Sequence, residues 1–187
     1  MTDFEFTFAL FGLLLGLSLA EVLSGLARAI EARLRLGAAV RIGWLTPLLG
    51  AFVFLDLLSF WQAAWVTRDV FQVSGMTLMT VSAFAGAYYL AASLVFPRGI
   101  AAAADMDDHF FRVRRIVIGV MFVLMMVQLA VYAATPALSV WLMNPLSLTM
   151  TAILAGLMIT AMVVRGQVWA RLAMIALVAR YIVVYLL

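Results

Sequence analysis

The most constraining feature of the sequence is a series of six long apolar stretches, because roughly 20 helical residues span the ~30 Å hydrocarbon core of a bilayer. The stretches are continuously apolar rather than alternating, which favours helices over the strands of a β-barrel. They cover residues Phe6–Ala27, Gly43–Val66, Met76–Phe96, Ile116–Ala134, Trp141–Val164 and Val168–Leu187. We therefore predict an all-α fold, a polytopic bundle of six transmembrane helices that forms a single domain over residues 1–187.

The composition excludes several classes of protein. Of the 187 residues, 67% are hydrophobic and 11% are charged, whereas about a quarter of the residues of a soluble domain are charged. The chain has no cysteine and one histidine, which excludes thiolate metal sites, haem attached through cysteine and paired histidine ligands. We expect no cofactor. All twelve basic residues are arginine, but no solvated surface is present to display them, so we expect no nucleic acid partner.

The arginines predict the orientation of the chain in the membrane. Only Arg68, balanced by Asp69, lies in a connection on the opposite side from ten others. These ten are Arg28, Arg33, Arg35, Arg41, Arg98, Arg112, Arg114, Arg115, Arg165 and Arg171. Because positive charge stays on the cytoplasmic side, we expect both termini on the outer, periplasmic side of a cell inner membrane. Residues 28–41 either continue the first helix into the cytoplasm or lie on anionic headgroups.

Four ionisable residues lie within the predicted spans. A charge in hydrocarbon costs a few kcal/mol, so each needs a partner, water or a neutral protonation state. By depth, Glu21 matches Arg171 and Asp56 matches Arg180, which predicts two ion pairs that hold the last helix against the first two. In the functional interpretation, Asp56 and Glu21 line a path for a cation or a proton. The sequence favours neither interpretation.

Other polar side chains within the spans lie where they could extend such a path. Tyr88 and Tyr89 are in the middle of the third span, where a hydroxyl needs a hydrogen-bond partner. The supporting residues are Ser59, Gln62, Tyr88, Tyr89 and Gln128.

Small residues recur at four-residue spacing in two spans and predict close helix packing. They are Gly12, Gly16, Ala20 and Ser24 in the first span, and Ala152, Gly156 and Thr160 in the fifth. We expect these stripes to pack inside the bundle. The alternative is an interface with another subunit.

An acidic turn precedes the fourth span, at Asp105, Asp107, Asp108 and His109. Carboxylate oxygens with one imidazole are candidate metal ligands. A simpler explanation is that Asp105 caps the fourth helix while Asp107 and Asp108 complement the positive end of its dipole. We favour the cap and predict no metal.

No catalytic motif is present: the sequence lacks a Walker loop, a GxGxxG, an HExxH and a Gly-x-Ser-x-Gly elbow. We therefore expect no enzymatic activity. Two functions remain. One is a small channel or secondary transporter that moves a cation or proton past the buried carboxylates. The other is a non-catalytic membrane subunit or scaffold that packs against a larger membrane complex. In either case we expect a homo-oligomer or a complex subunit within the lipid bilayer.

Overall fold

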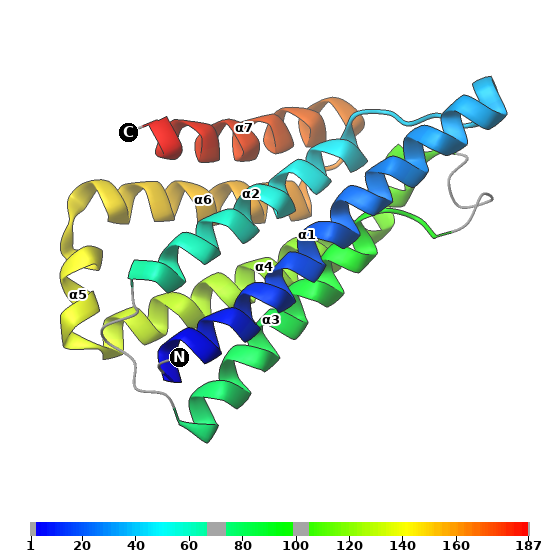
Figure 1. Ribbon diagram of the computed structural model, residues 1–187. Coiled ribbons are helices and arrows are strands. Elements are labelled where there is room, and N and C mark those ends of the chain that lie inside the picture. The colour runs from blue at the N-terminus through cyan, green and yellow to red at the C-terminus, as the bar shows by residue number, and fades with distance from the viewer. Residues whose placement is uncertain (1–2, 67–73, 99–104, 187) are drawn as a thin grey trace.

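The computed structural model describes residues 3–66, 74–98 and 105–186, and these form helices with no strand (Figure 1). The helices are α1 (Asp3–Leu36), the short 3-10 helix η1 (Gly37–Ala39), α2 (Leu45–Val66), α3 (Gly75–Val95), α4 (Met106–Ala134), α5 (Pro136–Met143), α6 (Pro145–Val163) and α7 (Gln167–Leu186). Six of them, all but η1 and α5, are long and apolar enough to cross a membrane. The chain is therefore an all-α, multi-pass membrane protein.

The ends of three helices differ from the predicted spans. α1 continues through residues 28–36 without a break, and α4 begins at Met106, ten residues before the predicted start. The connection predicted before the fifth span contains α5, and the span itself begins at Pro145 rather than at Trp141. Asn144 separates the two helices because its side chain accepts a hydrogen bond from the Leu146 amide (3.0 Å) and caps α6.

The spanning helices pack as a closed ring in the order α1, α3, α4, α6, α7 and α2. α2 contacts α1, α3, α4 and α7, so it is the most enclosed of the six. Its buried side chains include Leu49, Phe52, Val53 and Leu57. The middle of α2 is therefore the place where a polar side chain is surrounded by the most helices.

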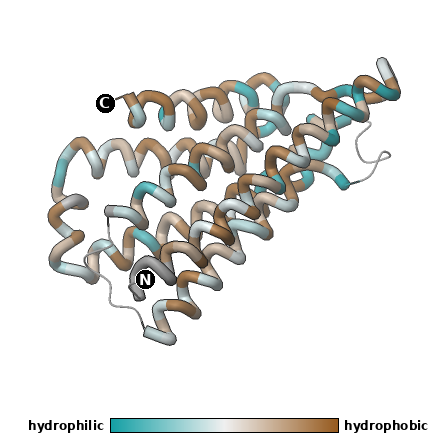
Figure 2. Tube along the Cα trace, in the orientation of Figure 1, coloured by the Kyte–Doolittle hydropathy of each residue, from teal (hydrophilic) through white to brown (hydrophobic). Residues whose placement is uncertain are grey.

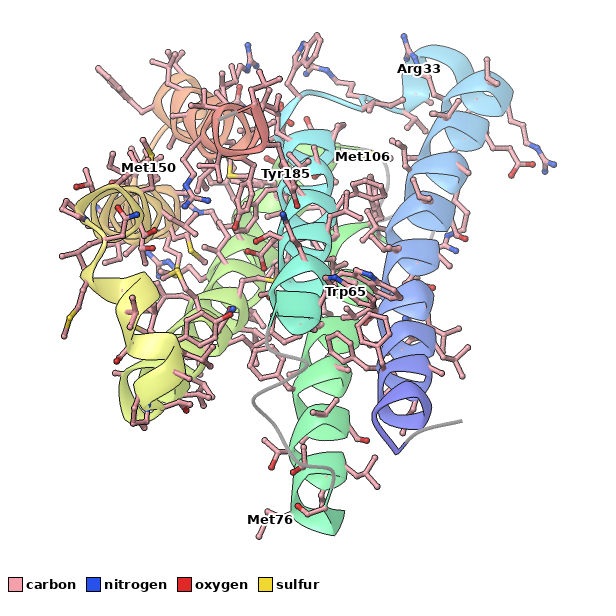
Figure 3. All side chains as sticks on the ribbon, turned by 60° about the vertical axis from the view of Figure 1, so that its left-hand side comes forward. Arg33, Trp65, Met76, Met106, Met150 and Tyr185 are labelled. Carbon is pink, nitrogen blue, oxygen red and sulfur yellow. The ribbon has the colours of Figure 1, made fainter. Side chains whose placement is uncertain are left out.

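The helix ends that carry most of the arginines meet at one end of the bundle, which we call the arginine-rich end. It contains the end of α1, the starts of α2, α4 and α7 and the ends of α3 and α6, while the start of α1, the end of α7 and α5 lie at the opposite end (Figure 1). Arg68 and Asp69 lie outside the described residues. Hydrophilic residues gather at the arginine-rich end, whereas the spans are mostly hydrophobic (Figure 2). Arg33 and Met76 mark the two ends in Figure 3.

The α1 face that packs into the bundle is not the one that the small residues predicted. Its buried residues alternate at spacings of four and three, a heptad pattern that keeps one face toward its neighbours. They are Phe11, Leu15, Ser18, Val22, Gly25 and Ala29. Gly12 does face α2, because a Cβ there would lie 2.5 Å from the Trp61 ring.

Most of the two small-residue stripes lies on the outer surface, so their predicted internal packing is wrong. Gly16, Ala20 and Ser24 are exposed on α1, and Ala152, Gly156 and Thr160 are exposed on α6. A methyl group added to Gly16 or Gly156 would meet nothing within 4 Å in the described part of the chain. The predicted stripe carries only small side chains, whereas the larger Phe11, Leu15 and Val22 on the heptad face are buried in the bundle, which explains the orientation of α1 about its axis.

Gly25 and Gly16 provide a matched test of this packing. A Cβ on Gly25 would lie 2.6 Å from Cδ2 of Phe96, at the end of α3, whereas one on Gly16 would meet open space. We expect Gly25→Ala to destabilise the bundle by about 1–3 kcal/mol through overpacking, and Gly16→Ala to cause no loss. Thermal unfolding in detergent measures both; an equal response of the two variants would contradict this orientation of α1.

A set of hydrogen bonds, which we call the α2–α4 clasp, joins the first turns of α2 and α4 at the arginine-rich end. The Thr46 hydroxyl donates to the Met106 carbonyl (2.5 Å), and the Met106 amide donates to the Arg41 carbonyl (3.1 Å). The buried Asp107 carboxylate accepts a hydrogen bond from the Leu45 amide (3.0 Å). Gly43 has φ +61, and a Cβ there would strike the Asp107 carboxylate, so glycine is required at this turn.

Candidate functional site

The candidate site is centred on Asp56, at the middle of α2. Its carboxylate accepts hydrogen bonds from Tyr88 of α3 (2.7 Å) and from Tyr181 of α7, one on each oxygen. We call these three residues together with Arg180 the Asp56 cluster. An isolated ionised carboxylate is costly to bury, and here two hydroxyl groups from two other helices satisfy it. The cluster thus ties α2, α3 and α7 together within the membrane.

Aromatic packing holds both tyrosines in place. Tyr88 is 3% exposed and Tyr181 is 1% exposed. The Tyr88 ring lies 5.3 Å from that of Phe60 and 5.6 Å from that of Phe84, and Tyr181 lies 6.0 Å from Phe52. These neighbouring rings restrict the movement of both tyrosines and keep their hydroxyl groups directed at Asp56.

Arg180 lies beside this site but does not form the predicted ion pair with Asp56. Its Nη2 donates to the Met150 carbonyl of α6 (3.2 Å), and its guanidinium lies 5.0 Å from the centre of the Tyr181 ring. Asp56 and Arg180, both in the described part of the chain, form no ion pair within 4 Å, although each contacts Tyr181. The buried Arg180 Nε has no hydrogen-bond partner among the described residues. Matching depth along the helices predicted Arg180 as the partner, but the direct partners of the carboxylate are the tyrosines.

The second predicted ion pair, between Glu21 and Arg171, is also wrong. Glu21 instead pairs with Arg28 on its own helix (3.3 Å) and with Arg98 just beyond α3 (3.7 Å). Arg171 has a buried Nε without a hydrogen-bond partner in the described ranges. Arg28 is seven residues, or two turns, from Glu21, so a local partner was available on the same helix face. Glu21 therefore belongs to the arginine-rich end and not to the Asp56 cluster.

Of the other polar residues predicted along the path, one contacts Asp56 and the others lie elsewhere on the helices. Tyr88 is the one that contacts Asp56. Tyr89 is 38% exposed, and Gln62 is also exposed. Ser59 and Gln128 are half-buried, and no hydrogen bond to Asp56 involves them in the described part of the chain. Within the described part of the chain, the side-chain hydrogen bonds of Asp56 are therefore those with Tyr88 and Tyr181.

The acidic turn caps α4, as predicted. The Asp105 side chain accepts hydrogen bonds from the amides of Asp107 (2.9 Å) and Asp108 (3.3 Å). The Asp107 carboxylate accepts a hydrogen bond from the Leu45 amide, and His109 Nε2 lies 3.1 Å from the Leu94 carbonyl. Within residues 3–66, 74–98 and 105–186, no group of three or more His, Cys, Asp or Glu side chains could hold a metal ion.

Two residues with important contacts were not predicted from the sequence. Tyr181 was missed, although the buried α7 residues Ala170, Ala173, Met174 and Leu177 continue to it at helical spacing. Arg114 was assigned only to topology. Its buried Nη1 donates to the carbonyls of Ala161 (3.1 Å) and Val164 (2.7 Å), which caps the C-terminal end of α6.

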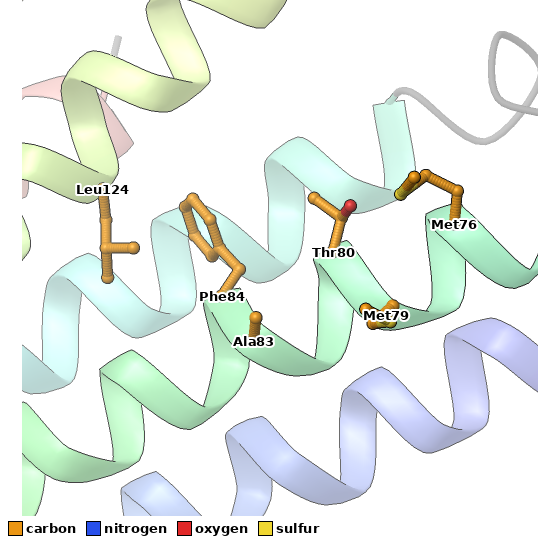
Figure 4. A pocket seen from close by; sticks show the side chains of 6 residues that line it. All are labelled: Met76, Met79, Thr80, Ala83, Phe84 and Leu124. Atoms are coloured by element: carbon orange, nitrogen blue, oxygen red, sulfur yellow. The ribbon is translucent and has the colours of Figure 1, made fainter.

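An apolar hollow of about 410 Å³ lies between α3 and α4 (Figure 4). Leu124 lines it from α4, and the other lining residues come from α3: Met76, Met79, Thr80, Ala83 and Phe84. None of these side chains is ionisable, so the hollow offers no chemistry comparable to that of the Asp56 cluster.

Comparison with known protein families, curated proteins and solved structures gives no match for this chain.

Two adjacent tyrosines test the hydrogen bonds of the site. Tyr88 donates to Asp56, whereas its neighbour Tyr89 faces outward. We expect Tyr88→Phe to destabilise the bundle by about 1.5–3 kcal/mol, the usual value of a hydrogen bond to a charged group, and Tyr89→Phe to have little effect. Unfolding in detergent provides the measurement. If Tyr88→Phe is as stable as the wild type, the Tyr88 bond does not contribute to folding.

Proposed function

We propose that this protein is a small secondary transporter or channel of the cell inner membrane that moves protons, and that Asp56 binds and releases the transported proton. The arginine-rich end would face the cytoplasm, with both termini in the periplasm. The observation that carries the proposal is the position of Asp56: an ionisable carboxyl group at mid-membrane depth, held by tyrosines from two other helices. Ionisable groups at such positions are characteristic of proton and ion pathways.

The geometry fits a proton better than a metal cation. Both tyrosines point an O–H toward the carboxylate, so its two oxygens already act as acceptors. A hard divalent cation takes six or more oxygen ligands, whereas the carboxylate and the two hydroxyls together supply only four. A proton can be accommodated because a hydroxyl group both donates and accepts.

Protonation of Asp56 would change how three helices are joined. The charged carboxylate accepts from both hydroxyls, but a neutral carboxyl group donates one hydrogen itself. One tyrosine must then turn its hydroxyl to accept from the carboxyl group, and neither bond is any longer made to a charged acceptor, which weakens the links of α2 to α3 and α7 without breaking them. Arg180 at the same time loses a nearby negative charge that offsets its own. Proton binding is thus coupled to the packing of α7.

The test is proton flux into liposomes that contain the purified protein, driven by a membrane potential and followed with a trapped pH-sensitive dye. We expect flux well above that of protein-free liposomes, with no comparable flux of sodium or potassium. Liposomes that pass no protons at any imposed potential or pH gradient would contradict the proposal.

A non-catalytic membrane subunit is the second candidate, favoured by the exposed small residues. Gly16 on α1 and Gly156 on α6 allow close approach of another helix, and nothing in the described part of this chain covers them. In that case the Asp56 cluster serves as a structural clamp. Native mass spectrometry of Gly16→Leu and Gly156→Leu tests it: loss of an assembly that the wild type forms supports the subunit function, and an unchanged assembly state contradicts it.

A further inference from the structure

The last three turns of α1 extend beyond the bundle at the arginine-rich end. α3 ends opposite Gly25, where the Phe96 ring packs directly on the glycine. Residues Leu26–Leu36, which we call the α1 overhang, continue for roughly 16 Å at 1.5 Å per residue. Figure 1 shows this end of α1 projecting past the other helices, and Figure 3 labels Arg33 within it.

The α1 overhang is held in place by hydrogen bonds to the linker that follows it. Arg33 Nη1 donates to the carbonyls of Gly37 (2.5 Å) and Val40 (2.8 Å). Ala29 and Val40 are both buried. These contacts cover one face of the overhang and leave the opposite face open.

The open face is apolar and continues the outer face of the membrane-spanning part of α1. Ile30 is 47% exposed and Leu34 is 80% exposed, and they follow the exposed Leu23 at spacings of seven and four residues. Residues at these spacings lie on one side of a helix. Lipid that covers Leu23 in the membrane therefore meets Ile30 and then Leu34 along the same face.

The charges around this face are mostly positive. Arg28, Arg33, Arg35 and Arg41 lie on the overhang and its linker, against Glu31, which pairs with Arg35 (2.5 Å). Arginine beside apolar side chains is the pattern of a helix that lies at the surface of an anionic membrane.

We infer that the α1 overhang is a binding surface for anionic phospholipid headgroups. Ile30 and Leu34 enter the boundary between headgroups and acyl chains, and the exposed Arg35 and Arg41 contact the negatively charged headgroups. Since Leu34 lies beyond the end of α3, contact with lipid requires α1 to be tilted in the membrane, as spanning helices commonly are.

The absence of cysteine from the sequence makes a direct test simple. A nitroxide is attached to Leu34→Cys in the full-length protein, in vesicles of phosphatidylcholine with or without phosphatidylglycerol. Its collisions with oxygen, which concentrates in lipid, are compared with those with a water-soluble nickel complex. Leu23→Cys is the lipid reference, and Ala39→Cys, exposed in η1, is the water reference.

In vesicles with phosphatidylglycerol, we expect the Leu34 label to resemble the Leu23 label, with oxygen collisions favoured several-fold over those of the Ala39 label. High salt, pure phosphatidylcholine, or Arg35→Gln with Arg41→Gln should shift it toward water. A Leu34 label that resembles the Ala39 label in anionic vesicles overturns the inference and favours a protein partner. Equal shielding in both lipids also overturns it, because headgroup charge would then play no part.

Discussion

Asp56→Asn is expected to reduce proton flux in liposomes to that of protein-free liposomes while the protein remains folded. Asparagine cannot bind and release a proton in the accessible pH range, so the proposed carrier of the proton is lost. Its amide can still accept from one tyrosine and donate to the other hydroxyl, so the links of α2 to Tyr88 and Tyr181 survive. Flux is measured with a trapped pH dye, and folding by gel filtration and thermal unfolding.

Glu21→Gln is the matched control for this result. Glu21 is the other carboxylate predicted on the transport path, but it pairs with Arg28 and Arg98 at the arginine-rich end. We expect Glu21→Gln to keep the flux of the wild type. Full flux through folded Asp56→Asn would contradict the role of Asp56. An Asp56→Asn variant that fails to assemble, with a wild type that passes nothing, would instead support the subunit function.

Asp107→Ala is expected to cause the largest loss of stability among single substitutions at the arginine-rich end, about 3 kcal/mol. The Asp107 carboxylate is buried and is the acceptor for the Leu45 amide at the start of α2. Removing it deletes a charge-assisted hydrogen bond and leaves a buried N–H without an acceptor. Chemical or thermal unfolding in detergent provides the measurement.

Asp108→Ala is the control, because Asp108 is exposed and lies in the same first turn of α4. Both substitutions remove one negative charge from the positive end of the helix dipole, which accounts for about 0.3–1 kcal/mol in each. The difference between the two variants therefore isolates the bond to Leu45. Equal losses from both would mean that the α2–α4 clasp does not stabilise the fold.

The number and nature of the spans could be predicted from the sequence, because bilayer thickness requires long apolar helices. The short helix α5 was not predicted, because its eight residues are too few to cross a membrane and the search for long apolar stretches does not detect it. The cap at Asp105 could be predicted because capping depends on neighbours two and three residues away.

The contacts of the site were predicted only in part. Depth along a helix placed Asp56 and Arg180 at the same level, but it does not determine helix rotation or which helices are adjacent. Rotation of α7 turns Tyr181 toward Asp56 and leaves Arg180 to the Met150 carbonyl of α6. The same limit applies to α1, where the heptad face with Phe11, Leu15 and Val22 points into the bundle and Gly16 faces outward.

The central claim is that Asp56 changes its protonation state inside the folded bundle, and infrared difference spectroscopy during a pH titration tests it most directly. A protonated carboxyl group absorbs at a carbonyl frequency distinct from that of a carboxylate, and membrane samples are suitable for the method. We predict a carbonyl band that appears as pH falls, is missing from Asp56→Asn and is shifted in Tyr88→Phe by the lost hydrogen bond. Identical titration spectra for the wild type and Asp56→Asn, over the pH range in which the protein moves protons, would contradict the claim.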